Sequence, residues 1–270
     1  MHLQRWITGL TALPFLIFLI YKGGTAFAVF IALVCLLSLG EYFRILEGGQ
    51  TKGLLAFLPL FSMLSGMLTI LAVHTFTGEI ILCIAAFYFI ICAFYSLTRF
   101  KENPAVLSKA AAAVQGYVYI PVFLSFAILI RSGSNGMLWF FMLLALIFAG
   151  DIGAFYAGTY WGKHKLCPSV SPGKTLEGSA GGLFANVAVG AVIKIFFLSG
   201  IPWGSCIIFF LCLGIAGQVG DLFESQFKRV AGVKDSGVIL PGHGGILDRI
   251  DALLFALPIA FFFKKYILWV

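Results

Sequence analysis

Charged residues are scarce in this 270-residue chain, and their scarcity excludes a soluble fold. Asp, Glu, Lys and Arg make up 11% of the sequence, against about 25% in an average soluble domain. Hydrophobic residues reach 61%, and the mean hydropathy is +1.03. A soluble chain of this length has too little interior to bury so much apolar surface. The composition therefore indicates an integral membrane protein.

Paired cysteines and the common nucleotide-binding loop are also missing. The six cysteines include no Cys-x-x-Cys pair, and five of them lie in apolar runs, where cysteine acts as a small hydrophobic residue. This argues against a disulfide framework and against a zinc site. The stretch SPGKTLEGS, residues 171–179, is not a Walker A motif, because the first glycine and the preceding strand are absent.

Long apolar runs are what the sequence has instead. A helix of about 20 apolar residues crosses a hydrocarbon core of about 30 Å. Nine such runs predict an all-α, polytopic transmembrane fold, and we expect residues 1–135 to form N-terminal transmembrane helices and residues 136–270 to carry C-terminal helices and the functional loops of the same membrane unit. The expected spans are 5–21, 25–45, 54–74, 78–97, 106–130, 137–160, 180–199, 204–225 and 248–268.

The lysines and arginines are distributed unevenly between the two sides of these spans. Thirteen of the eighteen fall on one side, four (Lys22, Arg131, Lys264 and Lys265) on the other, and Lys194 inside a span. Cytoplasmic loops carry an excess of Lys and Arg. The distribution therefore predicts a cytoplasmic N-terminus, and it places the two longest connections, 161–179 and 226–247, on the cytoplasmic side.

Several of the eleven carboxylates lie inside these spans or at their edges. An ionisable group inside a span costs at least about 2.5 kcal/mol on insertion scales and is a functional candidate by default. Asp221, Glu224, Ser225 and Lys228 have the spacing of residues that share one helix face, if the helix of the eighth span continues to Lys228. The carboxylates concerned are Asp151, Asp221, Glu224, Asp248 and Asp251.

Asp248 and Asp251 have a structural explanation as well as a functional one. They stand three residues apart at the expected start of the last helix, where the N-terminus favours negative charge and they could simply be caps. Capping does not account for the neighbouring glycines, or for the second group of carboxylates on the preceding helix.

Carboxylates that converge at one membrane surface repel one another unless a cation lies between them. Mg²⁺ takes one or two carboxylates and completes its shell with water and substrate phosphates. Basic residues nearby would neutralise phosphate oxygens. A carboxylate-held metal beside basic residues is typical of phosphoryl or nucleotidyl transfer. The basic candidates are Lys174, Lys228, Arg229, Lys234 and Arg249.

Two glycine-containing stretches add candidate phosphate-binding groups. In PGHGGILD, residues 241–248, Gly244 and Gly245 would let backbone N–H groups approach a polyphosphate, and the following helix start adds donors. His243 is a general acid, a phosphate ligand or only a strut in a tight turn. In the other stretch, residues 171–179, the candidate donors are Ser171, Lys174 and Thr175, and an ordinary turn followed by a helix cap is the alternative.

The run SQFKRVAGVKDSGVILPGHGGILDRID, residues 225–251, resembles the signature of the phosphatidate cytidylyltransferases, also called CDP-diacylglycerol synthases. GDIGAFYAGTYWGKHKL and SPGKTLEGSAGG resemble further stretches of that family, whereas the first 130 or so residues match only as apolar helices. The signature residues are Ser225, Lys228, Arg229, Lys234, Asp235, Gly237, Pro241, His243, Gly244, Gly245, Asp248, Arg249 and Asp251.

The resemblance implies transfer of CMP from CTP to phosphatidate with release of pyrophosphate, as a step of phospholipid synthesis. It implies a Mg²⁺ cofactor, a helical membrane fold, a homodimer and no nucleic-acid partner. Asp221 and Asp248, with Asp251, would hold Mg²⁺, and the carboxylates are numerous enough for a second cation.

The resemblance also assigns roles to the remaining candidates. Lys228 and Arg229 would bind phosphates, with Lys174 and Arg249 as further candidates. Ser225 would donate a hydrogen bond to a phosphate oxygen. Asp151 would form the floor of the site or pair with a basic residue. The triphosphate would be lined by His243, Gly244 and Gly245.

Two alternatives stay open at this point. One is a related membrane cytidylyltransferase that acts on another lipid phosphate. The other is an ion-coupled transporter, a class that uses intramembrane acids and glycine-interrupted helices. Against a transporter, the polar residues gather at one surface and no two similar halves are visible.

Overall fold

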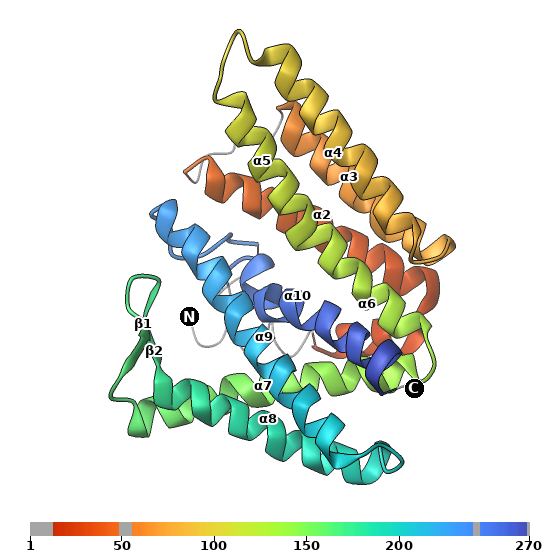
Figure 1. Ribbon diagram of the computed structural model, residues 1–270, viewed down its shortest axis with the longest axis vertical. Coiled ribbons are helices and arrows are strands. Elements are labelled where there is room, and N and C mark those ends of the chain that lie inside the picture. The colour runs from red at the N-terminus through yellow and green to blue at the C-terminus, as the bar shows by residue number, and fades with distance from the viewer. Residues whose placement is uncertain (1–12, 49–55, 240–243, 269–270) are drawn as a thin grey trace. The chain divides into compact units, whose positions relative to one another are not determined.

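The computed structural model describes residues 13–48, 56–239 and 244–268. The secondary-structure elements of this part of the chain are all helices apart from one short hairpin (Figure 1). A short apolar helix, Leu13–Lys22, comes first. The elements that follow are α2 (Gly24–Leu46), α3 (Phe57–Thr75), α4 (Ile80–Arg99), α5 (Val106–Tyr117), η2 (Val118–Val122), α6 (Phe123–Ser132), α7 (Gly136–Trp161), β1 (Lys165–Cys167), β2 (Ser171–Thr175), α8 (Leu176–Phe197), α9 (Trp203–Val230), α10 (Leu247–Phe262) and η3 (Phe263–Ile267).

Seven segments of the described chain are long and apolar enough to cross a membrane. They are α2, α3, α4, the continuous stretch Val106–Ser132, α7, α8 and α9. Each coincides with an expected span, so the chain is a helical, polytopic membrane protein as predicted. The first expected span lies partly outside the described residues, and the last corresponds to the shorter α10 with η3. The count of nine spans stays a prediction.

The stretch 161–179, expected to be a loop, contains the antiparallel hairpin β1–β2. Strands of three and five residues are too short to give a clear alternating pattern, which is why the sequence did not indicate them. Glu177, in the first turn of α8, accepts hydrogen bonds from the backbone N–H groups of Lys163 and His164, at 3.0 and 3.2 Å. The His164 ring lies 2.6 Å from the same carboxylate. These contacts hold the base of the hairpin against α8.

The described residues divide into two compact units. Unit 1 contains the chain up to Ser132 together with residues 230–249. Unit 2 contains residues 133–229 and the residues from Ile250 onward. The segment that follows α9 therefore belongs with helices from the opposite end of the sequence, and α10 begins in unit 1 and continues in unit 2.

Polar side chains pair with one another inside unit 1. The Ser62 hydroxyl lies 2.6 Å from Tyr88 Oη, and Thr69 Oγ1 lies 2.6 Å from Tyr117 Oη. The Tyr88 and Tyr117 rings stack with their centroids 4.0 Å apart. Such pairing satisfies hydroxyl groups that have no water partner in an apolar interior. Pro121, which lacks an N–H group, interrupts the α5–α6 span within the π-helical turn η2.

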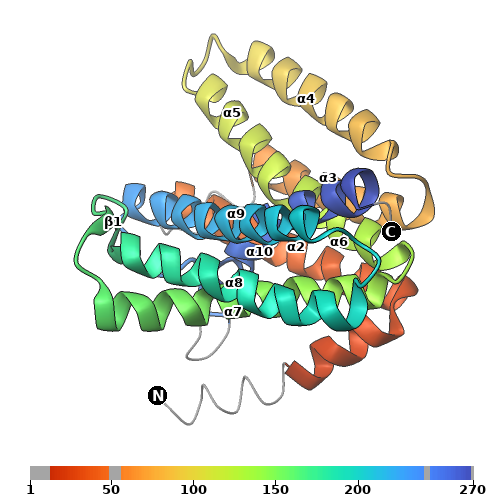
Figure 2. The same cartoon turned by 60° about the horizontal axis from the view of Figure 1, so that its bottom comes forward.

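Unit 2 is built on two helices that lie side by side, α7 and α8 (Figures 1 and 2). Small residues line their contact, so the two backbones approach closely: an added Cβ at Gly153 would lie 2.8 Å from the carbonyl oxygen of Gly181. Helix α9 contacts α8 through side chains, with Asn186 filling the space beside Gly214. Small residues at helix contacts are what membrane helices use for close packing.

Candidate active site

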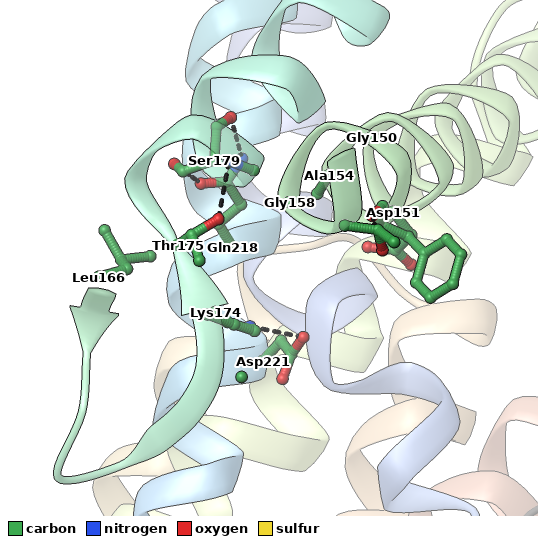
Figure 3. A pocket seen from close by; sticks show the side chains of 14 residues that line it. Gly150, Asp151, Ala154, Gly158, Leu166, Lys174, Thr175, Ser179, Gln218 and Asp221 are labelled. Carbon is green, nitrogen blue, oxygen red and sulfur yellow. Dashed lines mark hydrogen bonds and ion pairs between the residues drawn. The ribbon is translucent and has the colours of Figure 1, made fainter. Parts of the chain in front are cut away.

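A cavity of about 550 Å³ lies in unit 2 where α7, the hairpin, α8 and α9 meet (Figure 3). Four residues expected from the sequence line it: Asp151 from α7, Lys174 and Thr175 from β2, and Asp221 from α9. Much of the remaining lining is glycine and alanine, which leaves backbone groups accessible at the cavity wall. The hairpin thus brings a lysine to the carboxylate of a helix about fifty residues further along the chain.

Lys174 and Asp221 form an ion pair at this cavity (Figure 3). Lys174 Nζ lies 2.6 Å from Asp221 Oδ2, and the two side chains are 28% and 36% exposed. Each of the two charged groups therefore fixes the orientation of the other, and both remain accessible from the cavity. The Ser225 hydroxyl, one turn further along α9, points to Asp221 Oδ1 at 3.5 Å. The expected face of α9 is confirmed for these two residues.

Thr175 acts as the N-cap of α8. Its hydroxyl oxygen accepts a hydrogen bond from the backbone N–H of Gly178 at 3.1 Å, which satisfies one of the free donors at the helix start. The helix-cap explanation of this loop therefore holds for Thr175. Ser171 begins β2 and pairs with Cys167 of β1.

Two further cavity residues, Ser179 and Gln218, were not singled out from the sequence. Gln218 Nε2 donates to the Ser179 carbonyl at 3.0 Å, and the Ser179 hydroxyl donates to Gln218 Oε1. The available signal was spacing, since Gln218 precedes Asp221 by three residues and so shares its helix face. The pair ties α8 to α9 at the cavity (Figure 3).

The Asp251 carboxylate of α10 is influenced by charged side chains from two other helices of unit 2. The charges of Asp221, Lys228 and Asp151 all act on the Asp251 carboxylate in α10. Asp251 Oδ1 also accepts a hydrogen bond from the backbone N–H of Ala252 at 2.8 Å. Negative charges that act on a neighbouring carboxylate favour a cation beside it. Within the described residues, no group of three or more His, Cys, Asp or Glu side chains is already arranged around a metal position.

The end of α9 carries the basic pair Lys228 and Arg229. Lys228 forms an ion pair with Glu224, one turn earlier, whose side chain is fully buried. Arg229 Nε donates to the carbonyl oxygen of Val170 at 2.9 Å, which ties α9 to the hairpin turn. Glu224 thus orients Lys228, and Arg229 fixes the hairpin that carries Lys174.

Asp248 and its neighbours belong to unit 1. Asp248 Oδ2 accepts hydrogen bonds from the backbone N–H groups of Ser236 and Gly245, at 3.0 and 2.8 Å, and from the Ser236 hydroxyl at 3.0 Å. Gly244 has a φ of +83°, which favours glycine. Asp248 therefore ties Ser236 and Gly245 to the first turn of α10, and Arg249 beside it is exposed. His243 lies outside the described residues.

Fold and site together define a polytopic membrane protein with a cavity that contains a lysine–aspartate ion pair. A sequence profile of the cytidylyltransferase family matches residues 3–267. The chain is 33% identical over 258 residues to a phosphatidate cytidylyltransferase of Staphylococcus epidermidis, covering 94% of this chain and 96% of that protein. It is 32% identical over 262 residues to the enzyme of that name from Bacillus subtilis, covering 96% of each.

The chain therefore belongs to the cytidylyltransferase family. It is an enzyme, a nucleotidyltransferase, and this membership decides against the ion-coupled transporter considered from the sequence.

Proposed function

We propose that this chain is a phosphatidate cytidylyltransferase, which transfers CMP from CTP to phosphatidate and releases pyrophosphate. Its product, CDP-diacylglycerol, serves phospholipid synthesis. Similarity over nearly the full length to bacterial enzymes of that name supports this function. The structural observation that carries it is the Lys174–Asp221 pair at a cavity of about 550 Å³, where a cation and a carboxylate are both accessible to a polyphosphate.

The reaction needs no strong general base. A phosphate oxygen of phosphatidate bonds to the α-phosphorus of CTP, the bond from that phosphorus to the bridging oxygen of the β-phosphate breaks, and its electron pair leaves with pyrophosphate. A phosphomonoester is already anionic at neutral pH, so the attacking oxygen carries its own charge. The obstacle is the mutual repulsion of two anions, which positioned charges reduce.

The basic residues supply part of that charge. Lys174 would exchange its contact with Asp221 for a phosphate oxygen, which it can reach because it is partly exposed. Lys228, oriented by the buried Glu224, would bind a second phosphate group. Arg229 and Arg249 complete the proposed set. Ser225 would donate a hydrogen bond to a phosphate oxygen, and Gly244 and Gly245, with His243, would line the triphosphate.

The carboxylates fit a hard divalent cation. Asp151 and Asp221 both line the cavity, their charges act on Asp251, and Lys174 offsets part of the negative charge of Asp221. Mg²⁺ accepts a few carboxylates beside substrate phosphates, so we propose Asp221, Asp248 and Asp251 as its ligands, with room in the set for a second cation. When bound, Mg²⁺ would offset the charge of the CTP phosphates and of the leaving pyrophosphate.

Placement in the membrane completes the proposal. The uneven distribution of lysines and arginines supports a cytoplasmic N-terminus and a site on the cytoplasmic face, where CTP is present. The count of nine spans and the homodimer are predictions from the sequence.

Purified protein in detergent, supplied with labelled CTP, Mg²⁺ and one lipid at a time, tests the function. We expect phosphatidate to give CDP-diacylglycerol and pyrophosphate in equal amounts, and diacylglycerol, which lacks the attacking phosphate, to give nothing. Chelation with excess EDTA should abolish the product, and added Mg²⁺ should restore it. Product from an isoprenoid-ether phosphate but not from phosphatidate would reassign the substrate, and no product from either would overturn the proposal.

A further inference from the structure

A buried glutamate in the second helix contacts the signature segment from the other end of the chain. Glu41 lies in α2, and its side chain is only 4% exposed. Its carboxylate accepts hydrogen bonds from the backbone N–H groups of Ile246 and Leu247, at 3.0 and 2.8 Å, and from the Ser236 hydroxyl at 2.9 Å. These partners are about two hundred residues away in sequence, and all of them belong to unit 1.

The geometry explains how a lone carboxylate can be buried in an apolar helix. An ionised carboxylate that loses water must be compensated, and several N–H or O–H donors can do this. Ile246 and Leu247 stand at the start of α10, where backbone N–H groups have no partner within the helix. Glu41 therefore caps α10 from a different helix, and the positive end of the α10 dipole further stabilises its charge.

Two glycines of the signature, Gly237 and Gly245, lie against the Glu41 carboxylate. An added Cβ at Gly237 would overlap Glu41 Oε1, and one at Gly245 would overlap both the Glu41 carboxylate and the Ser236 hydroxyl. A side chain at either position would push Glu41 away from the loop. Glycine is therefore required at these two positions for a reason that is independent of phosphate binding: the carboxylate of Glu41, from α2, lies directly against them.

Ser236 links Glu41 to Asp248. Its hydroxyl lies 2.9 Å from Glu41 Oε2 and 3.0 Å from Asp248 Oδ2. Asp248 is also held by the backbone N–H groups of Ser236 and Gly245. A displacement of Glu41 would therefore loosen both the first turn of α10 and the donors that orient Asp248.

We infer that Glu41 is a positioning residue of the cytidylyl transfer. It fixes Ser236 and the first turn of α10, so that Asp248 and Arg249 are presented to the substrates in one orientation. This inference rests on the proposed function in that it takes Asp248 and Arg249 as site residues. It adds a residue from the N-terminal half of the chain to a site otherwise drawn from the C-terminal half.

The variant Glu41→Gln tests this role, because it keeps the size of the side chain and replaces one acceptor oxygen with an NH₂ donor. That donor must face either Ile246 N–H or the Ser236 and Leu247 donors, so the cap fails on one side. Glu47→Gln is the matched control, since Glu47 is the exposed residue that follows α2. Amide hydrogen exchange of the peptide around residues 244–250 is measured beside kcat and KM.

We expect Glu41→Gln to raise exchange at Ile246 and Leu247 at least about tenfold and to lower kcat roughly 10–100-fold, with a smaller change in KM, which is the usual scale for partners that orient ligand residues. Glu47→Gln should match the wild type in both readouts. Wild-type exchange in Glu41→Gln would show that Glu41 does not hold the loop. Raised exchange with wild-type kcat and KM would show that its hold does not serve the reaction. Either result overturns the inference.

Two further arms keep the test decisive. If Glu41→Gln does not insert or fold, Ser236→Ala, which removes the one hydroxyl shared by Glu41 and Asp248, is measured by the same criteria. The exchange measurement needs no turnover, so a wild-type chain that makes no CDP-diacylglycerol would contradict the proposed function, while exchange would still decide whether Glu41 anchors α10.

Discussion

At the scale of single residues, two lysines of the candidate site are each oriented by a partner of opposite charge. Lys174 is held by Asp221, and Lys228 by the buried Glu224. Helical spacing and the scarcity of charge in the spans were enough to predict that Asp221, Glu224, Ser225 and Lys228 share one face. Glu41 could have been identified as a candidate because it is a carboxylate inside an expected span. Its hydrogen-bond partners could not have been predicted, because they lie about two hundred positions away and no local sequence pattern connects them to Glu41.

Lys174 offers the sharpest residue-scale prediction. Lys174→Ala should raise the KM for CTP about tenfold or more and change kcat less, since a hydrogen bond to a charged group contributes roughly 1.5–3 kcal/mol and 1.4 kcal/mol is a factor of ten. The control is Lys165→Ala, which removes an exposed lysine from the other strand of the same hairpin. Steady-state kinetics with varied CTP make the comparison. A KM equal to that of the control would remove Lys174 from the CTP site.

At the scale of elements, unit 2 depends on close packing of helices that carry glycines at their contacts. The sequence predicted α7, α8 and α9 within a few residues, because each is a long apolar run. It did not predict the hairpin, whose strands are short and whose base is held by Glu177 through non-periodic contacts. Nor could composition show which glycines serve packing and which serve a turn, because that depends on the neighbouring helix.

Gly181→Ala tests the packing of α7 against α8. Its Cβ would overlap the Ala157 side chain, so we expect a destabilisation of roughly 1–3 kcal/mol, as for other overpacked sites, and a lower melting temperature. Gly204→Ala is the control, because a Cβ there meets open space and alanine is the better helix former. Thermal unfolding of the two purified variants gives the answer. Equal melting temperatures would show that the α7–α8 contact tolerates a methyl group.

At the scale of the whole molecule, hydropathy predicted the membrane class and the order of the spans, and family membership agrees with the signature. What the linear sequence could not give is the division into units: residues 230–249 join helices of the N-terminal half through hydrogen bonds such as those of Glu41. Those contacts use backbone N–H donors. Because every sequence has such donors, the contacts cannot be recognised from a pattern of residue types.

The predicted orientation has its own test. CTP is a polyanion that does not cross a bilayer, so a cytoplasmic site can be reached only from that side. Inverted membrane vesicles should make CDP-diacylglycerol from added CTP directly, whereas right-side-out vesicles should do so only after detergent treatment. Activity in intact right-side-out vesicles without detergent would place the site on the opposite face and contradict the orientation drawn from the lysines and arginines.

The central claim is that cytidylyl transfer takes place at the cavity where Asp221 meets Lys174, and the variant Asp221→Asn tests it most directly. Asparagine keeps the shape of the side chain but removes the charge that would hold both Lys174 and Mg²⁺. Measured with phosphatidate, labelled CTP and varied Mg²⁺, its kcat should fall at least about 100-fold, the scale of losing a charge-stabilising group at a reacting centre, while the melting temperature stays near that of the wild type. A folded Asp221→Asn protein with near-wild-type kcat and an unchanged Mg²⁺ requirement would contradict the account.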